Sequence, residues 1–256
     1  MNNTVEKLAR AMAESRNTAV FTGAGMSTES GLPDFRSSDG LWKKHRPEEL
    51  ASVDALNRNF GEFASFYRQR IASLGEVQPN RGHRLLADWE RRGLVRGIIT
   101  QNVDGLHQAA GSRVVHELHG TLREVRCQSC GHVRPAGTFA DEAECDRCGG
   151  RMRPAVVLFG EMLPEDALAA SSELASSCGV FLVLGSSLTV SPANLLPERA
   201  KRNGARLFIV NNTPTHVDRL ADGVIAASIG ETLEAVDRAL EALGDDARTR
   251  GGMANE

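Results

Sequence analysis

Short apolar runs alternate with amphipathic stretches along most of the chain. Four of these runs each end in a cluster of small or polar residues, and they lie at residues 19–21, 97–99, 180–184 and 206–210. Stretches with helical spacing lie between them, at 84–92 and 192–201. Strands that alternate with helices predict an α/β fold, with a doubly wound, mainly parallel sheet and helices on both faces. Such a sheet binds ligands beyond the carboxyl ends of its strands, where the polar clusters fall.

Two segments depart from this alternation. Residues 39–82 have the pattern of helices with a proline and several aromatic residues, whereas residues 123–153 contain cysteine and glycine and no long apolar run. We interpret both as insertions that together form a smaller domain. The polar stretch 246–256 is predicted to be a flexible tail. The larger sheet domain then comprises residues 1–38, 83–122 and 154–245.

Composition and charge exclude several kinds of partner. The chain has 256 residues, 41% of them hydrophobic, which is enough for a full core. A net charge of −3 provides no basic field for nucleic acid, and no apolar run approaches the roughly 18 residues of a membrane span. Residues 1–15 have helical spacing and mixed charges, unlike a secretory signal. We therefore expect a cytoplasmic protein that binds neither nucleic acid nor membranes. We also expect a monomer, although none of these features determines the oligomeric state.

Four of the five cysteines form two close pairs. Cys127 and Cys130 are separated by two residues, as are Cys145 and Cys148, and fourteen residues lie between the pairs. Two such turns can close a tetrahedral thiolate site for Zn²⁺. Four thiolates leave no position for water, so we predict one structural zinc ion per chain. The remaining cysteine, Cys178, is expected to be a buried apolar residue.

A glycine-containing turn directly follows the first predicted strand. Gly23-Ala24-Gly25 is a turn of the kind that lets main-chain amides approach a pyrophosphate at the start of a helix. The third glycine of the usual dinucleotide fingerprint is absent, so the turn alone also fits a simple tight connection. Its continuation to residue 36, GAGMSTESGLPDFR, closely resembles the NAD-binding signature of the sirtuin family.

Further motifs follow in the order found in sirtuins. They are TQNVDGLH at 100–107, ELHG at 117–120, PAVVLFGE at 154–161 and GSSL at 185–188. The resemblance extends over about residues 18–235, and the chain is identified as a member of the sirtuin family. It implies a Rossmann-like domain with a smaller zinc-binding and helical insert domain, in agreement with the pattern above.

The resemblance implies NAD-dependent removal of acyl groups from protein lysines, with release of nicotinamide and O-acyl-ADP-ribose. In that reaction His119 of the ELHG motif deprotonates a ribose hydroxyl, and an imidazole can take a proton near pH 7. His107 is assigned to loop structure and His116 to the surface. Asn102 and Asp104 match residues that position the nicotinamide ribose and hold its carboxamide, although an Asx turn explains them equally well.

The same resemblance assigns the residues that bind the co-substrate NAD. Phe35 is expected to shield the reactive carbon from water. The adenine contact near Ala227 is left open, with Ser228 and Ile229 as candidates, because the usual family glycine is missing there. Besides Asn102 and Asp104, the assigned residues are Gly23, Ala24, Gly25, Thr28, Asp34, Phe35, Arg36, Gln101, Val103, Gly185, Ser186, Ser187, Asn211 and Asn212.

The segment 156–160 resembles the stretch that pairs with an extended acyl-lysine peptide in sirtuins. Val156, Val157 and Phe159 are accordingly assigned to the protein substrate. Their apolar side chains suit the neutral stem of acetyl-lysine.

Tyr67 and Arg70 are spaced i and i+3 and should share one helix face. Sirtuins that remove succinyl or malonyl groups carry such a Tyr-x-x-Arg pair, with a small residue in an enlarged pocket that Ala55 is taken to match. A guanidinium and a phenol can pair with the distal carboxylate of succinyl-lysine. Alternatively, Arg70 is a solvated helix charge and Tyr67 a packing residue.

Two other functions use the same motifs. The chain could transfer ADP-ribose to protein, or it could bind NAD as a non-catalytic sensor. The set of His119, Asn102 and Asp104 argues against a sensor, because a pure binder has no use for a base beside the ribose.

Overall fold

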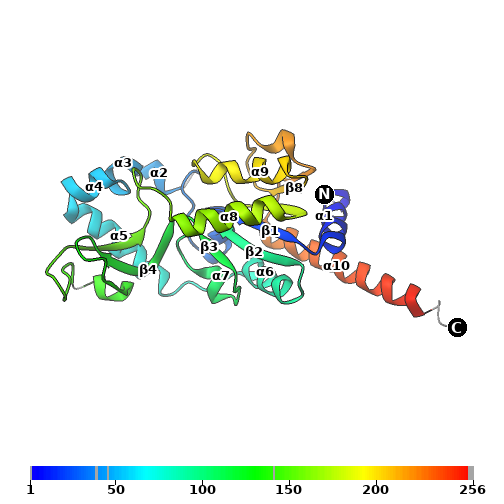
Figure 1. The fold of residues 1–256 in the computed structure, drawn as a ribbon, viewed down its shortest axis with the longest axis horizontal. Helices are drawn as coiled ribbons and strands as arrows, with labels where there is room; N and C mark the ends of the chain where they lie inside the picture. The colour runs from blue at the N-terminus through cyan, green and yellow to red at the C-terminus, as the bar shows by residue number, and fades with distance from the viewer. Residues whose placement is uncertain (1, 38–39, 45, 141, 253–256) are drawn as a thin grey trace.

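Two sheets of different size organise the described part of the chain. The computed structural model describes residues 2–37, 40–44, 46–140 and 142–252, and these contain a six-stranded and a three-stranded sheet (Figure 1). All strand pairs of the large sheet are parallel, whereas those of the small sheet are antiparallel. The predicted α/β fold with a smaller insert domain is confirmed.

The four predicted apolar runs all become strands of the large sheet. The strands are β1 (Thr18–Thr22), β2 (Val95–Thr100), β3 (Val115–Glu117), β4 (Gly120–Cys127), β5 (Val133–Pro135), β6 (Met152–Val156), β7 (Val180–Leu184), β8 (Arg206–Val210) and β9 (Gly223–Ile225). The α-helices are α1 (Asn2–Ser15), α2 (Leu41–Lys44), α3 (Pro47–Leu50), α4 (Val53–Arg58), α5 (Phe60–Leu74), α6 (Arg81–Arg91), α7 (Leu106–Ala109), α8 (Glu165–Ser177), α9 (Leu196–Arg202) and α10 (Ile229–Gly252). The 3-10 helices are η1 (Ala24–Ser30), η2 (Ala136–Phe139), η3 (Ala193–Leu195) and η4 (Asp218–Leu220).

The large sheet brings four strand ends to one edge. Its order is β3-β2-β1-β7-β8-β9, so the chain reverses its direction of growth at β1. Thr22 pairs with both Thr100 and Leu184, and Leu184 pairs with Val210. The loops after these four strands therefore begin side by side at the carboxyl edge, where doubly wound sheets bind ligands.

Helices cover both faces of the large sheet, because its strands are apolar on both sides. In β7, Phe181 and Val183 pack against α8 and α9, whereas Val180, Leu182 and Leu184 pack in a cluster with α1, α6 and α10 (Figure 1). A strand buried on both faces needs a continuous apolar run, which is the pattern seen in the sequence. None of the helices in the described residues combines the length and the apolar character of a membrane span.

The small domain combines both predicted insertions around one hydrophobic cluster. Phe63 and Tyr67 of α5 pack with Val125, Phe139 and Met152 from the cysteine-containing segment. The sheet of this domain, β5-β4-β6, also reaches beyond the predicted limits 123–153 at both ends. The predicted boundary between residues 38 and 39 lies outside the described residues.

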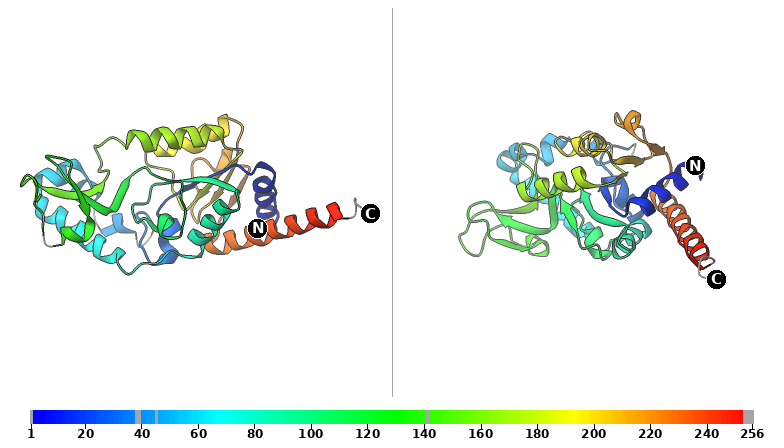
Figure 2. Two further views of the ribbon diagram at one scale, coloured as in Figure 1. Left: turned by 60° about the horizontal axis from the view of Figure 1, so that its bottom comes forward. Right: turned by 45° about the vertical axis from the view of Figure 1, so that its right-hand side comes forward.

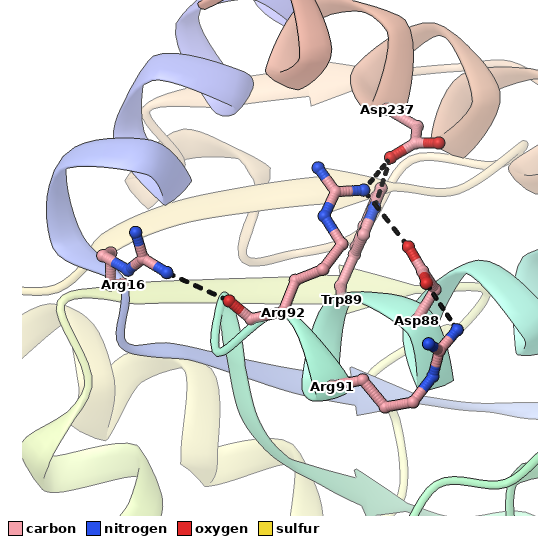
Figure 3. A network of polar contacts seen from close by, with 6 residues as sticks. All are labelled: Arg16, Asp88, Trp89, Arg91, Arg92 and Asp237. Atoms are coloured by element: carbon pink, nitrogen blue, oxygen red, sulfur yellow. Dashed lines mark hydrogen bonds and ion pairs between the residues drawn. The ribbon is translucent and has the colours of Figure 1, made fainter. Parts of the chain in front are cut away.

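The last helix, α10, runs past the end of the large sheet (Figure 2). It continues to Gly252 and so enters the predicted tail 246–256, while residues 253–256 lie outside the described part. Asp237 joins α10 to α6 by accepting hydrogen bonds from Trp89 Nε1 at 2.9 Å and from Arg92 Nη1 at 2.7 Å (Figure 3). Cys178, at the end of α8, is buried as expected.

Candidate active site

A cavity of about 920 Å³ opens at the carboxyl edge of the large sheet. The segments after β1, β2, β7, β8 and β9 form one side of it, and α5 and the segment after β6 form the other. All of the residues assigned to NAD from the sequence line this cavity, as does His119. Its volume is within the usual range for small-molecule sites. The structure therefore brings together residues from motifs spread over most of the chain.

Three glycines allow two loops to cross at main-chain contact on the floor of the cavity. The Gly25 N–H donates to the Gly185 carbonyl at 2.9 Å. A Cβ at Gly23 would lie 2.7 Å from the Gly185 oxygen, and one at Gly185 would lie 2.5 Å from the main-chain nitrogen of Met26. Side chains are thus excluded at this crossing. An uncovered main chain of this kind fits the close approach of a pyrophosphate, as NAD requires.

Asn102, Asp104 and Ser27 form a hydrogen-bonded chain beside this crossing. Ser27 Oγ donates to Asp104 Oδ2 at 2.7 Å, and Asn102 Nδ2 donates to Ser27 Oγ at 3.1 Å. Asp104 Oδ1 also accepts from the Leu106 N–H, so the expected Asx turn is present as well. Burial raises the pKa of Asp104, although these hydrogen bonds and the charge of Arg70 oppose the shift. Asn102 and Asp104 are therefore held by Ser27, a residue of the first motif, in addition to the local turn.

His119 lies between β3 and β4 and is followed by Gly120, a position that requires glycine. A Cβ at Gly120 would come within 2.2 Å of the Ala155 oxygen, and the φ of Gly120 is +71°. Burial lowers the pKa of His119, a hydrogen bond with the main chain of Gln101 raises it, and the charge of Arg36 lowers it further. The imidazole is consequently neutral near pH 7. A neutral imidazole that uses one ring nitrogen for Gln101 keeps the other available as a proton acceptor.

The other histidines of this region are structural. His107 is 1% exposed, and its Nε2 lies 2.9 Å from Thr22 Oγ1, in agreement with its assignment to loop structure. Its ring centroid is 4.8 Å from that of His83, which is fully buried and was not singled out from the sequence. His116 is half-buried within β3, which is an edge strand of the large sheet. Burial lowers the pKa of all three rings.

The far end of the cavity lies beyond β8 and β9. Ser187, Asn211 and Asn212 line it together with Ser228 and Ile229, the two candidates for the adenine contact. Hydroxyl and amide groups of this kind suit the hydrogen-bonding groups of an adenosine moiety.

Glu29, which the sequence analysis did not single out, also lines this end of the cavity. Its carboxylate accepts hydrogen bonds from Ser228 Oγ at 3.1 Å and from the Gly230 N–H at 2.9 Å. Glu29 thereby connects the first NAD motif with the start of α10, and a negative charge is favourable at a helix N-terminus.

Tyr67 and Arg70 line the opposite end of the cavity, from α5. Tyr67 is 2% exposed, and burial raises its pKa to about 12 despite the charge of Arg70. The Arg70 guanidinium carbon lies 5.4 Å from the ring centroid of Phe35 and 5.7 Å from that of Phe66. Arg70 is partly exposed and faces the cavity among aromatic rings, while Tyr67 also packs in the hydrophobic cluster of the small domain, as the alternative expects.

Ala55, assigned to the acyl pocket from the sequence, is not among the residues that line the cavity. It lies within α4 and packs in the hydrophobic cluster of the small domain. Ala51, four residues earlier, lines the cavity instead and accepts a hydrogen bond from the Phe159 N–H. Ala55 therefore does not belong to this cavity, because α4 begins at Val53 and turns Ala55 into the core.

Val156, Val157 and Phe159 line the cavity as expected, but their main chain is largely paired within the protein. The Val157 N–H donates to the His119 carbonyl at 2.8 Å. The Phe159 N–H and carbonyl pair with Ala51 and Val53. The Val157 carbonyl accepts no hydrogen bond from the described residues and is open to a ligand.

The four cysteine sulfurs converge at a point outside the cavity. Their Sγ atoms all lie within 4.8 Å of one another, with 3.5 Å between Cys127 and Cys148 and 3.7 Å between Cys130 and Cys145. Zn–S bonds of about 2.3 Å in a tetrahedron place sulfurs about 3.8 Å apart, so the group fits Zn²⁺. None of the four lines the cavity. A zinc ion held here is structural, as the sequence predicts.

Comparisons with known proteins agree with this geometry. The model of the Sir2 family matches residues 23–192. The chain belongs to the Sir2 family. A relative from Geobacillus kaustophilus, named NAD-dependent protein deacetylase 1, is 57% identical over 231 residues, which cover 90% of this chain and 96% of the relative.

Solved Sir2 structures resemble this Sir2-family chain over nearly its full length. A Sir2 homolog in complex with NAD is 41% identical with a TM-score of 0.87, and the match covers 93% of this chain and 94% of that one. A Sir2 structure with a p53 peptide and NAD⁺ is 36% identical with a TM-score of 0.82, over 93% of this chain and 98% of that one. The resemblance inferred from the motifs is confirmed.

Proposed function

We propose that this protein is an NAD-dependent protein-lysine deacylase that releases nicotinamide and O-acyl-ADP-ribose. The observation that carries the proposal is that a neutral imidazole, His119, shares one cavity with the glycine crossing and with the open Val157 carbonyl. A base, a pyrophosphate site and an amide acceptor are the parts that this reaction needs.

The glycine crossing at Gly23, Gly25 and Gly185 would hold the pyrophosphate of NAD. Ser187 and Asn211 would bind the adenosine half, while Asn102, Asp104 and their partner Ser27 would orient the nicotinamide half. When bound, NAD supplies an electrophilic ribose carbon and nicotinamide as a leaving group. The protein binds and orients the reactants and excludes water, with Phe35 at the boundary to solvent.

His119 would accept a proton from a ribose hydroxyl, which frees that oxygen to attack the acyl carbon. Gln101 fixes the orientation of the imidazole through one ring nitrogen. The open Val157 carbonyl would accept the amide N–H of the acylated lysine. Since Val157 is hydrogen-bonded to the main chain of His119, the substrate amide and the base are held in a fixed relation.

The replacement His119→Ala tests the role of this base. General-base catalysis contributes about 10²-fold to 10⁴-fold, so deacetylation of an acetyl-lysine peptide should slow by such a factor. The control is His216→Ala, because His216 is exposed and does not line the cavity. An alanine variant that turns over as fast as the parent would reject the proposed role of His119.

The same assay separates the alternatives. A deacylase releases nicotinamide only when the acyl-lysine peptide is present, whereas an ADP-ribosyltransferase labels protein and a sensor consumes no NAD. Transfer of label to protein, without acyl-dependent release of nicotinamide, would favour the transferase.

We also propose that negatively charged acyl groups are substrates beside acetyl. The Arg70 guanidinium faces aromatic rings in the cavity and has no carboxylate within hydrogen-bonding distance among the described residues. The carboxylate of succinyl-lysine would supply the missing partner, together with the Tyr67 hydroxyl. Ala51, which lines the same cavity, leaves room for a longer acyl chain.

Arg70→Met should abolish desuccinylation and spare deacetylation. A matched control is Arg68→Met, since Arg68 lies outside the cavity and donates from Nε to the Phe139 carbonyl at 2.8 Å. That variant should leave the ratio of the two activities unchanged. Mass spectrometry of peptides carrying acetyl, malonyl or succinyl lysine measures the ratio. Equal loss of both activities in Arg70→Met, or loss of neither, would reject the proposal.

We infer a cytoplasmic location and a monomeric state, which stay predictions. The net charge of −3 supports only the inference that the protein has no affinity for nucleic acid. Light scattering during size-exclusion chromatography, with the protein at several concentrations, tests the oligomeric state.

A further inference from the structure

An ion pair between buried Arg153 and half-buried Glu161 lies at the base of the segment that would receive the substrate. The Arg153 side chain is 4% exposed, and its two terminal nitrogens lie 2.6 Å and 2.9 Å from the two carboxylate oxygens of Glu161. Arg153 also donates to the carbonyls of Pro154 and Val156. One guanidinium thus binds both ends of the segment 154–161.

The Glu161 carboxylate closes this segment from the other end. It accepts the Leu158 N–H at 2.9 Å, while the Glu161 N–H donates to the Leu158 carbonyl at 2.9 Å. Burial would raise the pKa of Glu161, but the hydrogen bonds from Arg153 and Leu158 and the charges of Arg153 and Arg126 lower it. The carboxylate is therefore ionised at neutral pH, so both of its oxygens accept hydrogen bonds.

The middle of the segment leaves an acceptor open to a ligand. Val156, Leu158 and Phe159 each have their carbonyl bound within the protein, whereas the carbonyls of Val157 and Gly160 accept no hydrogen bond from the described residues. The Val157 N–H, meanwhile, is bound to the His119 carbonyl. The flanking bonds made by Arg153 and Glu161 therefore decide where the Val157 carbonyl points.

The pair also adjoins the acyl end of the cavity. Glu161 lines the cavity, and the charges of Arg153 and Glu161 both act on the phenol of Tyr67. Stability alone is a weak reason for such a pair, because burying two charges costs desolvation free energy that their attraction roughly offsets. A pair that fixes geometry at a ligand site has a use that an apolar pair of the same volume would lack.

We propose that Arg153 and Glu161 are positioning residues for the acyl-lysine substrate, which hold the Val157 carbonyl in place relative to His119. This inference rests on the proposed deacylase function. It separates two binding events, since the pair contacts the segment 154–161 and makes no contact with the glycine crossing. Loss of the pair should weaken binding of the peptide and leave binding at the dinucleotide site unchanged.

The test compares Glu161→Ala with Glu161→Gln in the full-length protein. We expect the alanine variant to raise both the Kd of an acetyl-lysine peptide, read by fluorescence anisotropy, and its KM by about tenfold or more, a loss of about 1.4 kcal/mol. The Kd of ADP-ribose, measured by calorimetry, should stay within about twofold. Glutamine retains one acceptor oxygen, which can serve Arg153 Nη2 and the Leu158 N–H, so it should recover part of the peptide affinity.

Further variants keep the test decisive. Asp54→Ala removes the exposed pair between Asp54 and Arg58 in the same domain and should change neither Kd. Arg153→Lys retains the charge but loses the two-pronged geometry, so it should weaken peptide binding to an intermediate degree. This variant replaces Glu161→Ala in the test if Glu161→Ala does not fold. Equal weakening of peptide and ADP-ribose, or unchanged peptide affinity in the variants, would overturn the inference.

The parent protein provides the reference for the proposed function. A parent that binds acetylated and unmodified peptide equally would contradict the deacylase function itself. A parent that prefers the acetylated peptide, combined with a Glu161→Ala variant that retains this preference in full, would contradict the positioning role alone.

Discussion

The two domains reach order by different physical means. In the large domain, strands such as β7 are buried on both faces between layers of helices, so apolar burial alone accounts for a stable core. Over its described part, the small domain has only three antiparallel strands, and β5 is exposed or half-buried along its length. Its cysteine-containing segment has little apolar surface and brings four thiolates together instead. A metal ion replaces part of the hydrophobic core there.

The comparison also separates the two substrates of the proposed reaction. The large domain supplies the glycine crossing and the strand ends where NAD would bind. The small domain and the segment 154–161 supply the acyl end, through Tyr67, Arg70 and the Val157 carbonyl. Damage confined to one domain should therefore affect one substrate more than the other.

Loss of zinc should have the largest effect, because it should unfold the small domain and leave the large domain folded. Structural zinc sites contribute about 10–16 kcal/mol in small zinc-binding peptides, more than a domain of this size can lose. In Cys145→Ser, we expect β4 to β6 to lose protection from hydrogen exchange while β1 and β7 keep theirs. Peptide binding should be lost, and ADP-ribose binding should persist. Zinc content by atomic absorption and exchange by mass spectrometry measure these outcomes.

Cys178→Ser is the control for that variant. Cys178 is buried in the cluster of α8 and α9 in the large domain, so its replacement should leave the small domain protected. Simultaneous loss of protection in β1 and β7 of Cys145→Ser would mean that the two domains unfold as one unit, contrary to the comparison.

The sequence predicted features that neighbouring residues encode. The zinc ligands lie in two short pairs, and the glycine crossing begins in one continuous motif. Both sites can therefore be recognised from the sequence alone. Ser27 and Glu29 lie inside that same motif, yet their partners Asp104 and Ser228 are distant in the chain. Only the folded structure reveals such contacts.

Ala55 and Ala51 illustrate a related difficulty. Both are small residues on one short stretch, and the choice between them depends on where α4 begins. Ser52 caps that helix by accepting the Ala55 N–H, which directs Ala55 into the core. The first residue of a helix is among the features that are hardest to predict. The sequence could therefore indicate a small residue in this stretch, but it could not decide between Ala51 and Ala55.

Acidification should destabilise the large domain through its buried histidines. Burial, helped by the charge of Arg84, lowers the pKa of His83 to about 4, against an ordinary value of 6.5. Between these values the unfolded chain binds more protons, so the free energy of unfolding falls as the pH drops from 6.5 toward 4. The loss from His83 is about 3 kcal/mol across this range. The pKa of His107 is lowered in the same direction.

His83→Gln should flatten this pH dependence, because glutamine does not titrate. Hydrogen exchange of β1 and β2 at pH 7 and pH 5 measures the large domain separately from acid release of zinc. His216→Gln, at an exposed histidine, should reproduce the parent profile. A His83→Gln variant with the full pH dependence of the parent would show that other groups cause the acid sensitivity.

The smallest effect concerns the polar contacts that join α10 to α6 within the large domain (Figure 3). Asp237 is 19% exposed and accepts from both Trp89 and Arg92. Asp237→Asn removes the charge and retains one acceptor oxygen, so the free energy of unfolding should fall by about 1 kcal/mol. The exposed change Glu241→Gln on the same helix should have no measurable effect. Urea unfolding provides both values. Because apolar burial dominates this domain, Asp237→Asn should leave the affinities for peptide and ADP-ribose unchanged. A fall of several kcal/mol in the free energy of unfolding would mean that α10 depends on charge pairing more than on its apolar face.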